Sequence, residues 1–575
     1  MKRYALVLIC SMLCALEGEL TSAIVQAEVI PDAGSILRDQ RPQLPKTVPM
    51  LPPEEKVASS SAKKADDGVK VMITKFIFKG YEEVLSESEL QDLTRDSLGK
   101  EQSYADLQRV TQVTTAYLKQ KGWFLARAYL PKQDVTSGTV QIEINPGKSD
   151  GNVSIKRDKS VRIKECILEC IADGTVHTDE PINEQSLAHA VLLMNDLPGI
   201  SARSSIAPGS ETGTSAVLFS VVEGPLLRGF LLGDNYGNRY TGTWRGSVMV
   251  GANDPFKYGD QMSLMLTRAE GLMQGRGTYT FPILYEGLKG NLAFTTMNYK
   301  LVAELAPSQY TGKSNTFEIG ITNPILRSRR SNALTSISYS YKSLLDSQAE
   351  TVLHDKELQN LTFSGSGDLQ DRLLGGGNTN WNASLTSGTY RHSGVTDITL
   401  TKTEGYFVHV NFALTRVQRL AERSILNLSW RGQAAISNLD SSEKFTLGGP
   451  YGVRAYPVGE GSGDDGHLYS AEYRYKIKTP PTWGDLQASL FYDAGFLKRN
   501  RVATTIDPNT ATNLNEYWLQ GAGVGLNYTF GTNFNLQLCW AHTIGDNAGR
   551  TKVTENNSDG KKENNRFWVQ GMMYF

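Results

Sequence analysis

Apolar and polar residues alternate along the chain from Leu226 to Phe575, and no helical period persists there. In one segment, one face carries Leu486, Ala488, Leu490, Tyr492 and Ala494, and the other carries Gln487, Ser489, Phe491, Asp493 and Gly495. The pattern recurs at 469–477 and 534–541 and in the last residues, which end on Phe575. Strands with one apolar and one polar face, repeated over this length, predict a transmembrane antiparallel β-barrel with a wet lumen.

The connections between these strands alternate between long polar segments and short turns. The long segments are 304–315, 345–357, 391–406, 447–466, 496–516 and 543–565, and the short ones include Gln418–Arg423, Lys478–Asp485 and Gly531–Asn533. Outer-membrane barrels have long outside loops and short periplasmic turns, and about 16 strands fit between 226 and 575. A pair of soluble β-sandwiches is the alternative, but sandwiches rarely run this long as one domain.

Residues 71–225 follow helical as well as extended periods. In 71–147, a strand at Val71–Phe78 precedes helices at Ser86–Leu98 and Ser103–Lys121, and two strands follow. Residues 148–225 repeat this order more weakly, with a last pair of strands around Ser204–Ala207 and Ala216–Val222. The repeat predicts two small α/β domains, 71–147 and 148–225, each ordered β-α-α-β-β.

Two cysteines lie in the first expected helix of the second repeat. An apolar stripe reads Ile163, Cys166, Ile167, Cys170 and Ile171. We expect Cys166 and Cys170 to be small buried residues of this stripe rather than a redox site. A helix holds residues four apart in poor disulfide geometry, although an oxidising compartment leaves their redox state open.

The N-terminal residues look like an export signal. Lys2 and Arg3 precede an apolar stretch from Tyr4 to Leu16, and Val25-Gln26-Ala27 offers a cleavage site. We therefore assign 1–27 to a signal peptide. Within 28–70, Asp32 can cap a short helix, and a linker rich in proline and serine follows it.

Composition and motifs exclude several other functions. The net charge is -1, so no overall basic field points to nucleic acid. The sequence has neither a His-Glu-x-x-His zinc motif nor a Gly-x-Ser-x-Gly nucleophile elbow. Gly312-Lys313-Ser314 suggests a P-loop, but Pro307 stands where the first glycine is required. No enzyme activity, metal or cofactor is expected.

A loop motif and a strand motif carry opposite charges. Val453-Arg454-Ala455-Tyr456 lies in a glycine-rich loop, and Phe491-Tyr492-Asp493-Ala494-Gly495 closes an alternating strand. Asp493 falls on the polar face of that strand, hence toward the lumen. Arginine is always charged, and its fork suits a carboxylate. We therefore expect Arg454 and Asp493 to pair inside the barrel; a solvated arginine and an unrelated lumen aspartate are the alternative.

Several short motifs lie along the chain. Gly80-Tyr81, Ala126–Gln133 and Asn195–Gly199 lie in the two α/β repeats. Asp234–Gly242 lies near the start of the barrel segment, and Asp254-Pro255-Phe256 with Gly259-Asp260-Gln261 follows it. Leu447-Gly448-Gly449-Pro450-Tyr451 leads into the loop motif at Val453. Together these motifs resemble the transporter partner of two-partner secretion systems (TpsB), the hemolysin secretion and activation family. The first group resembles the family's POTRA domains, the second its first barrel strand with its turn and the next turn, and the third its lumen loop. The resemblance covers essentially the whole chain after the signal.

This resemblance implies a bacterial outer-membrane barrel of 16 strands, two periplasmic POTRA domains and an N-terminal plug helix, here Asp32–Arg41. It implies that Arg454 pairs with Asp493, with Val453, Tyr456, Phe491 and Gly495 around them, and that Phe575 ends the barrel as its assembly signal. Ala455 stands where the family usually has glycine, and a left-handed backbone there would cost alanine about 1 kcal/mol.

The resemblance further implies that the POTRA domains bind an unfolded exoprotein of hemolysin, adhesin or toxin type, which crosses the barrel without ATP. Strand addition at an exposed sheet edge, for which we choose Ser204, Ser205 and Ile206, would bind this client. Outer-membrane lipid and the barrel assembly machinery are the other expected partners. A barrel-assembly insertase of the same superfamily is the main alternative, although only two POTRA domains fit here. A passive porin or receptor and a secreted enzyme are remoter.

Overall fold

The computed structural model describes residues 30–40, 70–82, 84–123, 125–173, 184–209, 214–284, 286–396, 402–502, 514–551 and 554–575. The chain forms two compact units, one of Leu44–Gly224 and one of Met1–Gln43 with Pro225–Phe575. The predicted signal peptide (1–27) and the linker after the plug helix lie outside the described residues. Among the described helices, none is long and apolar enough to cross a membrane.

The first α/β domain packs two helices on a three-stranded sheet. The sheet order is β2 (Lys75–Lys79), β5 (Thr139–Asn145), β4 (Arg127–Tyr129), with β2 and β5 parallel. Helices α3 (Glu87–Thr94) and α4 (Tyr104–Gln120) begin at capping boxes on Ser86 and Ser103. The predicted β-α-α-β-β order is observed, with one addition: β1 (Val71–Met72) pairs with β3 (Glu101–Gln102).

The second α/β domain repeats this arrangement. Its sheet order is β6 (Lys148–Arg157), β8 (Thr214–Glu223), β7 (Ile200–Pro208), again with one parallel and one antiparallel pair. Helices α5 (Glu165–Asp173) and α6 (Glu184–Asn195) stand between β6 and β7 in the sequence. In the described part of this sheet, β7 pairs only with β8, so it is an edge strand.

The expected burial of the two cysteines in α5 is wrong. Cys166 and Cys170 are both free and exposed. The buried residues of this helix are Ile167, Leu168, Ile171 and Ala172. The stripe is therefore turned by one residue, about 100° around the helix, from the one we predicted. The larger Ile and Leu side chains gain more from burial than a thiol does, so they set the buried face.

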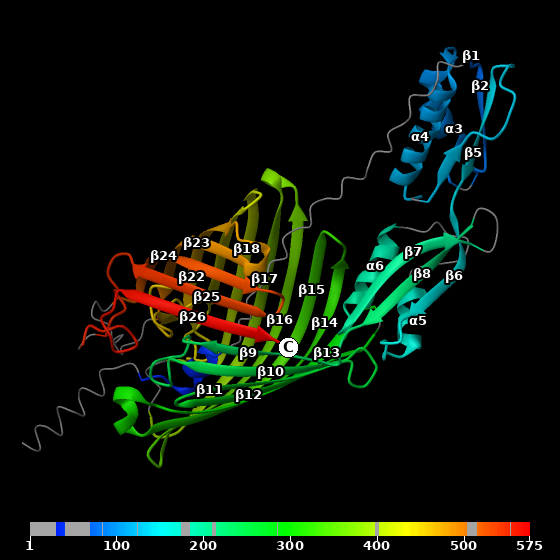
Figure 1. The fold of residues 1–575 in the computed structure, drawn as a ribbon. Coiled ribbons are helices and arrows are strands. Elements are labelled where there is room, and N and C mark those ends of the chain that lie inside the picture. The colour runs from blue at the N-terminus through cyan, green and yellow to red at the C-terminus, as the bar shows by residue number, and fades with distance from the viewer. Residues whose placement is uncertain are drawn as a thin grey trace, which may run out of the picture. The chain divides into compact units, whose positions relative to one another are not determined.

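The second compact unit contains a closed antiparallel barrel of 16 strands, which confirms the predicted fold class (Figure 1). Each barrel strand pairs with the barrel strands before and after it, with β20 (Phe445–Thr446) and β21 (Ser462–Gly463) left out between β19 and β22, and β26 pairs with β9 to close the barrel. The strands are β9 (Leu227–Asp234), β10 (Arg245–Asn253), β11 (Gln261–Ala269), β12 (Leu272–Pro282), β13 (Lys289–Lys300), β14 (Tyr310–Arg327), β15 (Ser331–Gln348), β16 (Thr351–Asp371), β17 (Gly377–Ser393), β18 (Gly405–Ala421), β19 (Ser424–Ala435), β22 (Asp465–Ile477), β23 (Asp485–Lys498), β24 (Glu516–Phe530), β25 (Phe534–Thr543) and β26 (Asn565–Tyr574).

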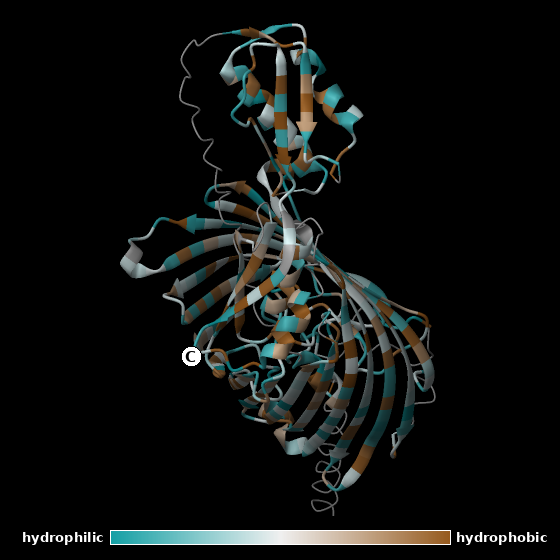
Figure 2. Ribbon diagram, turned by 90° about the vertical axis from the view of Figure 1, so that its right-hand side faces the viewer, coloured by the Kyte–Doolittle hydropathy of each residue, from teal (hydrophilic) through white to brown (hydrophobic). Residues whose placement is uncertain are grey.

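Hydrophobic and polar residues alternate along the barrel strands, as the banding in Figure 2 shows. In β23, Leu490 and Tyr492 are exposed on the outer face, whereas Phe491 and Asp493 are buried on the inner face. Other strands also carry buried polar and charged residues on their inner faces, including Lys342 in β15 and Lys356 in β16. The outer apolar face suits lipid and the inner face holds polar side chains, as the alternation predicted.

Two of the expected long loops are wrong. Half of 304–315 and most of 345–357 belong to strands, because β14 starts at Tyr310 and only Ala349 and Glu350 separate β15 from β16. Gly312-Lys313-Ser314 therefore lies in a strand and not in a loop. Polar residues occupy both faces of these strand ends: Lys356 is buried inside, and Asp355 and Glu357 are exposed outside. Without an apolar face, the sequence shows no alternation there.

The short helix α2 (Ala33–Asp39) lies inside the same compact unit as the barrel and packs against barrel residues. Asp32 caps it through a capping box with Ser35. Ala33 and Ile36 belong to a buried apolar cluster with, among others, Tyr299 of β13, Leu358 of β16 and Leu439. Its neighbours come from several strands of the wall, so the helix occupies the lumen, where the predicted plug was placed.

Candidate functional site in the barrel lumen

The lumen loop, residues 447–461, folds back on itself between the two short strands β20 (Phe445–Thr446) and β21 (Ser462–Gly463). These strands pair antiparallel at its base. Within the loop, the backbone amide of Val453 donates to the carbonyl of Leu447 at 2.7 Å, and that of Gly448 donates to the carbonyl of Glu460 at 2.8 Å. Gly449, Gly459 and Gly461 have φ of +103°, +86° and +63°. Such angles favour glycine, which explains the glycine-rich sequence.

Arg454 stands at the tip of this loop and meets Asp493 of β23. Its Nε donates to Asp493 Oδ2 at 2.8 Å and its Nη2 donates to Oδ1 at 2.9 Å. The backbone amide of Arg454 also donates to Oδ2, at 3.2 Å. The side chain of Asp493 is 1% exposed and that of Arg454 is 15% exposed. The structure thus brings together the two residues that strand parity predicted to meet, in a bidentate pair.

Two residues that the sequence analysis missed complete the contacts of the guanidinium. Arg454 Nη1 donates to Glu472 Oε2 of β22 at 2.8 Å, and Ser470 Oγ donates to Asp493 Oδ1 at 2.7 Å. Glu472 in turn accepts from Arg474 Nε at 2.8 Å. In the ladder of β22 and β23, Ser470 lies opposite Asp493 and Glu472 opposite Phe491. Parity already placed both residues on the lumen face, but only the register shows that they reach Arg454.

The guanidinium also lies over an aromatic ring. Its central carbon is 3.3 Å from the centre of the Phe491 ring, a cation–π contact. Burial acts to lower the pKa of Arg454, but the carboxylates of Asp493 and Glu472 outweigh it and raise the pKa above its ordinary value. Arg454 therefore stays charged in its buried site. We call Arg454, Asp493, Glu472 and Phe491 the arginine cluster.

Apolar packing fixes the rest of the loop against the wall. Val453, Ala455, Tyr456 and Phe491 belong to one buried cluster together with Leu447. A side chain at Gly495 would come within 2.5 Å of Leu447 Cδ2, and one at Gly521 would come within 2.5 Å of Ala455 Cβ. These wall glycines make room for the loop, which gives Gly495 of the strand motif a structural role.

The expected strain at Ala455 is not found. The structure describes the whole of the loop, and φ at Ala455 is not positive. Its methyl group is 1% exposed and lies against Gly521. The larger residue is therefore accommodated by a missing side chain on the facing strand, with no left-handed backbone.

Further side chains of the wall hold the backbone of the lumen loop at and near Arg454. Trp568 of β26 donates its indole N–H to the carbonyl oxygen of Arg454 at 2.7 Å. Arg431 of β19 donates to the carbonyl oxygen of Tyr451 at 2.6 Å. The loop is thus held by side chains of β19, β22, β23 and β26. The sequence did not indicate the contacts of Trp568 and Arg431, because a single tryptophan or arginine in an alternating strand does not show what it will contact.

The helix α2 is tied to the barrel by a second set of charged residues. Lys356 of β16 pairs with Asp32 at 2.5 Å and with Asp440 at 3.0 Å. The backbone amide of Ala33 donates to Asp346 Oδ1 of β15 at 2.8 Å. Burial acts to raise the pKa of Asp32, but Lys356 and Ser441 outweigh it and lower the pKa below its ordinary value. We call Asp32, Lys356, Asp440 and Asp346 the helix contacts.

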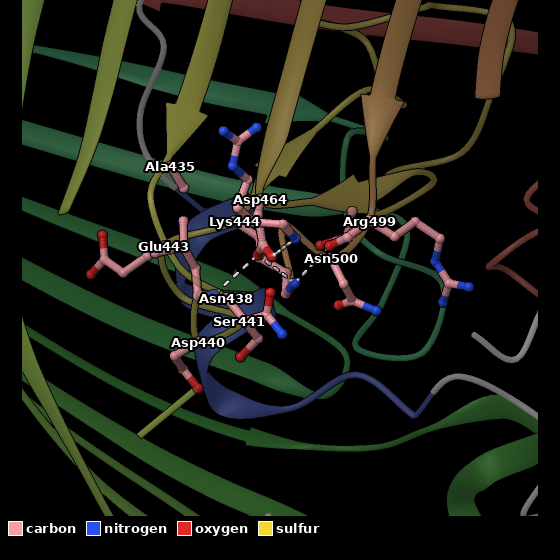
Figure 3. A network of polar contacts seen from close by, with 12 residues as sticks. Ala435, Asn438, Asp440, Ser441, Glu443, Lys444, Asp464, Arg499 and Asn500 are labelled. Carbon is pink, nitrogen blue, oxygen red and sulfur yellow. Dashed lines mark hydrogen bonds and ion pairs between the residues drawn. The ribbon is translucent and has the colours of Figure 1, made fainter. Parts of the chain in front are cut away.

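The segment 438–444, which follows β19, connects the helix to the base of the lumen loop (Figure 3). Arg38 donates from Nη1 to the carbonyl of Ser441 at 2.8 Å and to Ser462 Oγ at 3.0 Å. At the other end of the segment, Lys444 pairs with Asp464 at 2.6 Å. Asp464 also accepts the backbone amides of Leu439 and Arg501 at 3.0 and 2.8 Å. Helix, segment and loop base therefore form one buried polar network.

The remaining predicted site residues lie elsewhere. Ser204, Ser205 and Ile206 lie on the edge strand β7, and Ile206 is 38% exposed. Phe575 extends the closing ladder, since its backbone amide and carbonyl both bond to Gly229 at 3.0 Å. Among the described residues, no group of three or more His, Cys, Asp or Glu side chains could hold a metal ion.

Comparison with known proteins places these features in a family. The model of the haemolysin secretion/activation protein ShlB/FhaC/HecB family matches residues 213–528, and that of the ShlB-type POTRA domain matches 71–147. The chain therefore belongs to the ShlB/FhaC/HecB family of haemolysin secretion/activation proteins. It is an outer-membrane transporter of the two-partner secretion type, whose barrel lies in the outer membrane and whose POTRA domains are periplasmic.

Individual relatives are distant but match over most or nearly all of the chain. The heme/hemopexin transporter protein HuxB of Haemophilus influenzae strain 86-028NP is 25% identical over 97% of both chains. The outer membrane transporter CdiB of Dickeya dadantii is 21% identical over 77% of this chain and 78% of its own.

Solved structures show the same fold. CdiB from Escherichia coli superposes with a TM-score of 0.66 at 16% identity, covering 98% of each chain. BamA from Haemophilus ducreyi, lacking POTRA domains 1–3, gives 0.54 at 14% identity, covering 88% of this chain and all of its own. The likeness to BamA shows a shared fold only, and the family match leaves the insertase alternative less supported.

Proposed function

We propose that this chain exports one large exoprotein through its barrel, and that the arginine cluster holds the lumen loop in the position that transport requires. One observation carries this proposal: Arg454 is held by carboxylates of two adjacent wall strands and by the ring of Phe491. An inserted loop fixed by a buried charge keeps a defined position while a client moves past it. No nucleotide is needed for such an arrangement.

The client is an unfolded exoprotein of hemolysin, adhesin or toxin type. Because relatives are named heme/hemopexin transporter proteins, an exoprotein that binds heme or hemopexin is a further candidate. In the periplasm, the client adds a strand to an open sheet edge, for which β7 with Ser204, Ser205 and Ile206 is available. Backbone hydrogen bonds supply affinity, and exposed side chains such as Ile206 supply selectivity.

The test compares the supernatant and outer-membrane proteomes of a strain lacking this chain with those of its parent. Loss of one large protein from the supernatant, with outer-membrane barrels unchanged, is the expected result and names the client. A broad fall in outer-membrane barrels would mean that the chain inserts barrels instead. Exchange of residues 71–225 for those of a relative then tests the POTRA assignment, because client choice should follow the exchanged domains.

A further inference from the structure

A buried carboxyl group on the C-terminal arm of the lumen loop has no part in the arginine cluster. Glu460 is 2% exposed. Its Oε1 accepts from Asn547 Nδ2 at 2.9 Å, and its Oε2 accepts from the backbone amide of Ser558 at 2.6 Å. Among the described lysines and arginines, none forms an ion pair with it. A carboxyl buried without a cation depends on these two donors.

Both donors belong to the outer loop, residues 544–564, which joins β25 to β26. Asn547 is itself 5% exposed and is fixed on all sides: it also donates to Asn557 Oδ1 at 2.9 Å and accepts from the amide of Gly549 at 2.8 Å. Asn557 continues the network by donating to the carbonyl of Glu563 at 3.3 Å. The described residues of the outer loop, 544–551 and 554–564, are therefore folded around the residue that meets Glu460.

Glu460 also belongs to the closed base of the lumen loop. Its carbonyl accepts the amide of Gly448, and a side chain at Gly448 would come within 2.6 Å of Glu460 Cβ. Burial acts to raise the pKa of Glu460 above its ordinary value, although Asn547 and Ser558 oppose this. Losing the two donors would therefore cost free energy whether the carboxyl group is charged or neutral.

We propose that Glu460 is a positioning residue that fastens the lumen loop to the outer loop, so that the lumen loop cannot move unless the outer loop also opens. The arginine cluster then holds the tip of the lumen loop to the wall, and Glu460 holds its C-terminal arm to a surface loop. This inference deepens the proposed function and rests on it for its role in export, but the contact itself is tested separately.

The test uses the full chain in intact cells with the variant Glu460→Gln. The carboxamide replaces one of the two accepting oxygens with an NH2 group, which would face either Asn547 Nδ2 or the backbone amide of Ser558 donor to donor, so one of the two hydrogen bonds is lost. Added trypsin should cleave the outer loop after Lys561 or Lys562 roughly tenfold faster than in the parent, because a buried hydrogen bond between the lumen loop and the outer loop is lost. The purified variant should also show more frequent openings in planar bilayers.

Asp546→Asn is the matched control. It makes the same change from acid to amide in the same outer loop, at a side chain that is 99% exposed, and it should leave cleavage and openings unchanged. Asn547→Ala removes a donor from the other side and should reproduce Glu460→Gln. Heat-modifiable migration on gels shows whether each barrel is folded and inserted.

The double variant Glu460→Gln with Asn547→Asp exchanges the roles of amide and carboxylate across the contact. Slow cleavage should return at least in part, which a merely local loss of packing would not give. Parental cleavage and openings in both Glu460→Gln and Asn547→Ala would overturn the proposal. If the strain lacking the chain secretes normally, the proposed function is wrong, while the cleavage result still decides whether the two loops are fastened together.

Discussion

The arginine cluster and the helix contacts both use buried charges to hold an element inside the barrel, but they hold it by different means. Arg454 meets Asp493 and Glu472, which stand on neighbouring strands in an unbroken ladder. The helix α2 has only seven residues, and a helix of that length does not persist alone in water. Its fold depends on the lumen around it, whereas the residues that hold Arg454 (Asp493, Glu472 and Phe491) belong to strands of the wall.

The lumen loop also buries more apolar side chains than the helix α2 does. Around Arg454, the loop residues Leu447, Val453, Ala455 and Tyr456 are all buried in one cluster with the wall. In α2, Ala33 and Ile36 are the fully buried apolar side chains, and burying one such Ile is worth about 1.5–3 kcal/mol. Removing the helix therefore exposes less apolar surface than removing the loop. We infer that the helix is the removable element of the two.

The largest effect is expected for Arg454→Ala. The change leaves Asp493 and Glu472 buried without their shared cation, so the tip of the lumen loop loses its attachment. We expect the barrel to insert at normal abundance and secretion of the client to be abolished. Quantification of the client in supernatants, with barrel abundance measured in outer membranes, checks this. Arg423→Ala, at an exposed arginine in the turn before β19, is the control. Normal export by Arg454→Ala would show that the cluster has no role in transport.

A second comparison separates the two carboxylates of the cluster. Asp493 accepts from three groups of Arg454 and from Ser470, whereas Glu472 accepts from one group of Arg454 and is also paired with Arg474. Asp493→Asn should destabilise the folded barrel by about 3–5 kcal/mol, because it removes the main partner of a buried charge. Glu472→Gln should cost about 1–2 kcal/mol. Urea unfolding of the two variants in liposomes measures both, and equal losses of stability would contradict this order.

Much of this architecture could be predicted from the sequence, because the alternation of residues between the two faces of a strand can be seen within a single segment of the chain. Alternation assigned Asp493 to the lumen face and identified the barrel, and the loop motif placed Arg454. Register is not local, so the sequence did not show that Glu472 reaches the same guanidinium, or that Trp568 of β26 bonds to the carbonyl of Arg454. Both depend on how distant strands meet.

Two errors have equally local causes. The apolar stripe of α5 fitted two orientations one residue apart, and the thiols of Cys166 and Cys170 were too small to decide between them. The ends of β14 to β16 resemble loops in sequence because their outer faces are polar like their inner faces. The helix contacts were missed for a further reason: Lys356 is an ordinary lysine in sequence, and only the fold brings it to Asp32 and Asp440.

The comparison predicts that α2 can be released without loss of transport. Lys356→Gln removes the cation between Asp32 and Asp440 and leaves two buried carboxylates facing each other. We expect pore openings in planar bilayers to rise by roughly tenfold or more, and secretion to continue. Lys313→Gln, at an exposed lysine on the outer face of β14, should change neither. If Lys356→Gln blocked secretion as fully as Arg454→Ala, transport would require the fixed helix as much as the fixed lumen loop, and the prediction would be wrong.

The smallest effect is expected from the fold of the helix itself. Ser35 exchanges hydrogen bonds with Asp32 in the capping box, accepting from its amide at 3.0 Å. Ser35→Ala leaves the ion pair of Asp32 with Lys356 intact and weakens only the cap, by about 0.5–1 kcal/mol. Pore openings should therefore increase by roughly fivefold or less, well below the effect of Lys356→Gln, in the same bilayer recordings. A larger increase for Ser35→Ala would mean that helix folding, more than the charge on Lys356, keeps α2 in the lumen, because only the cap differs between that variant and the parent.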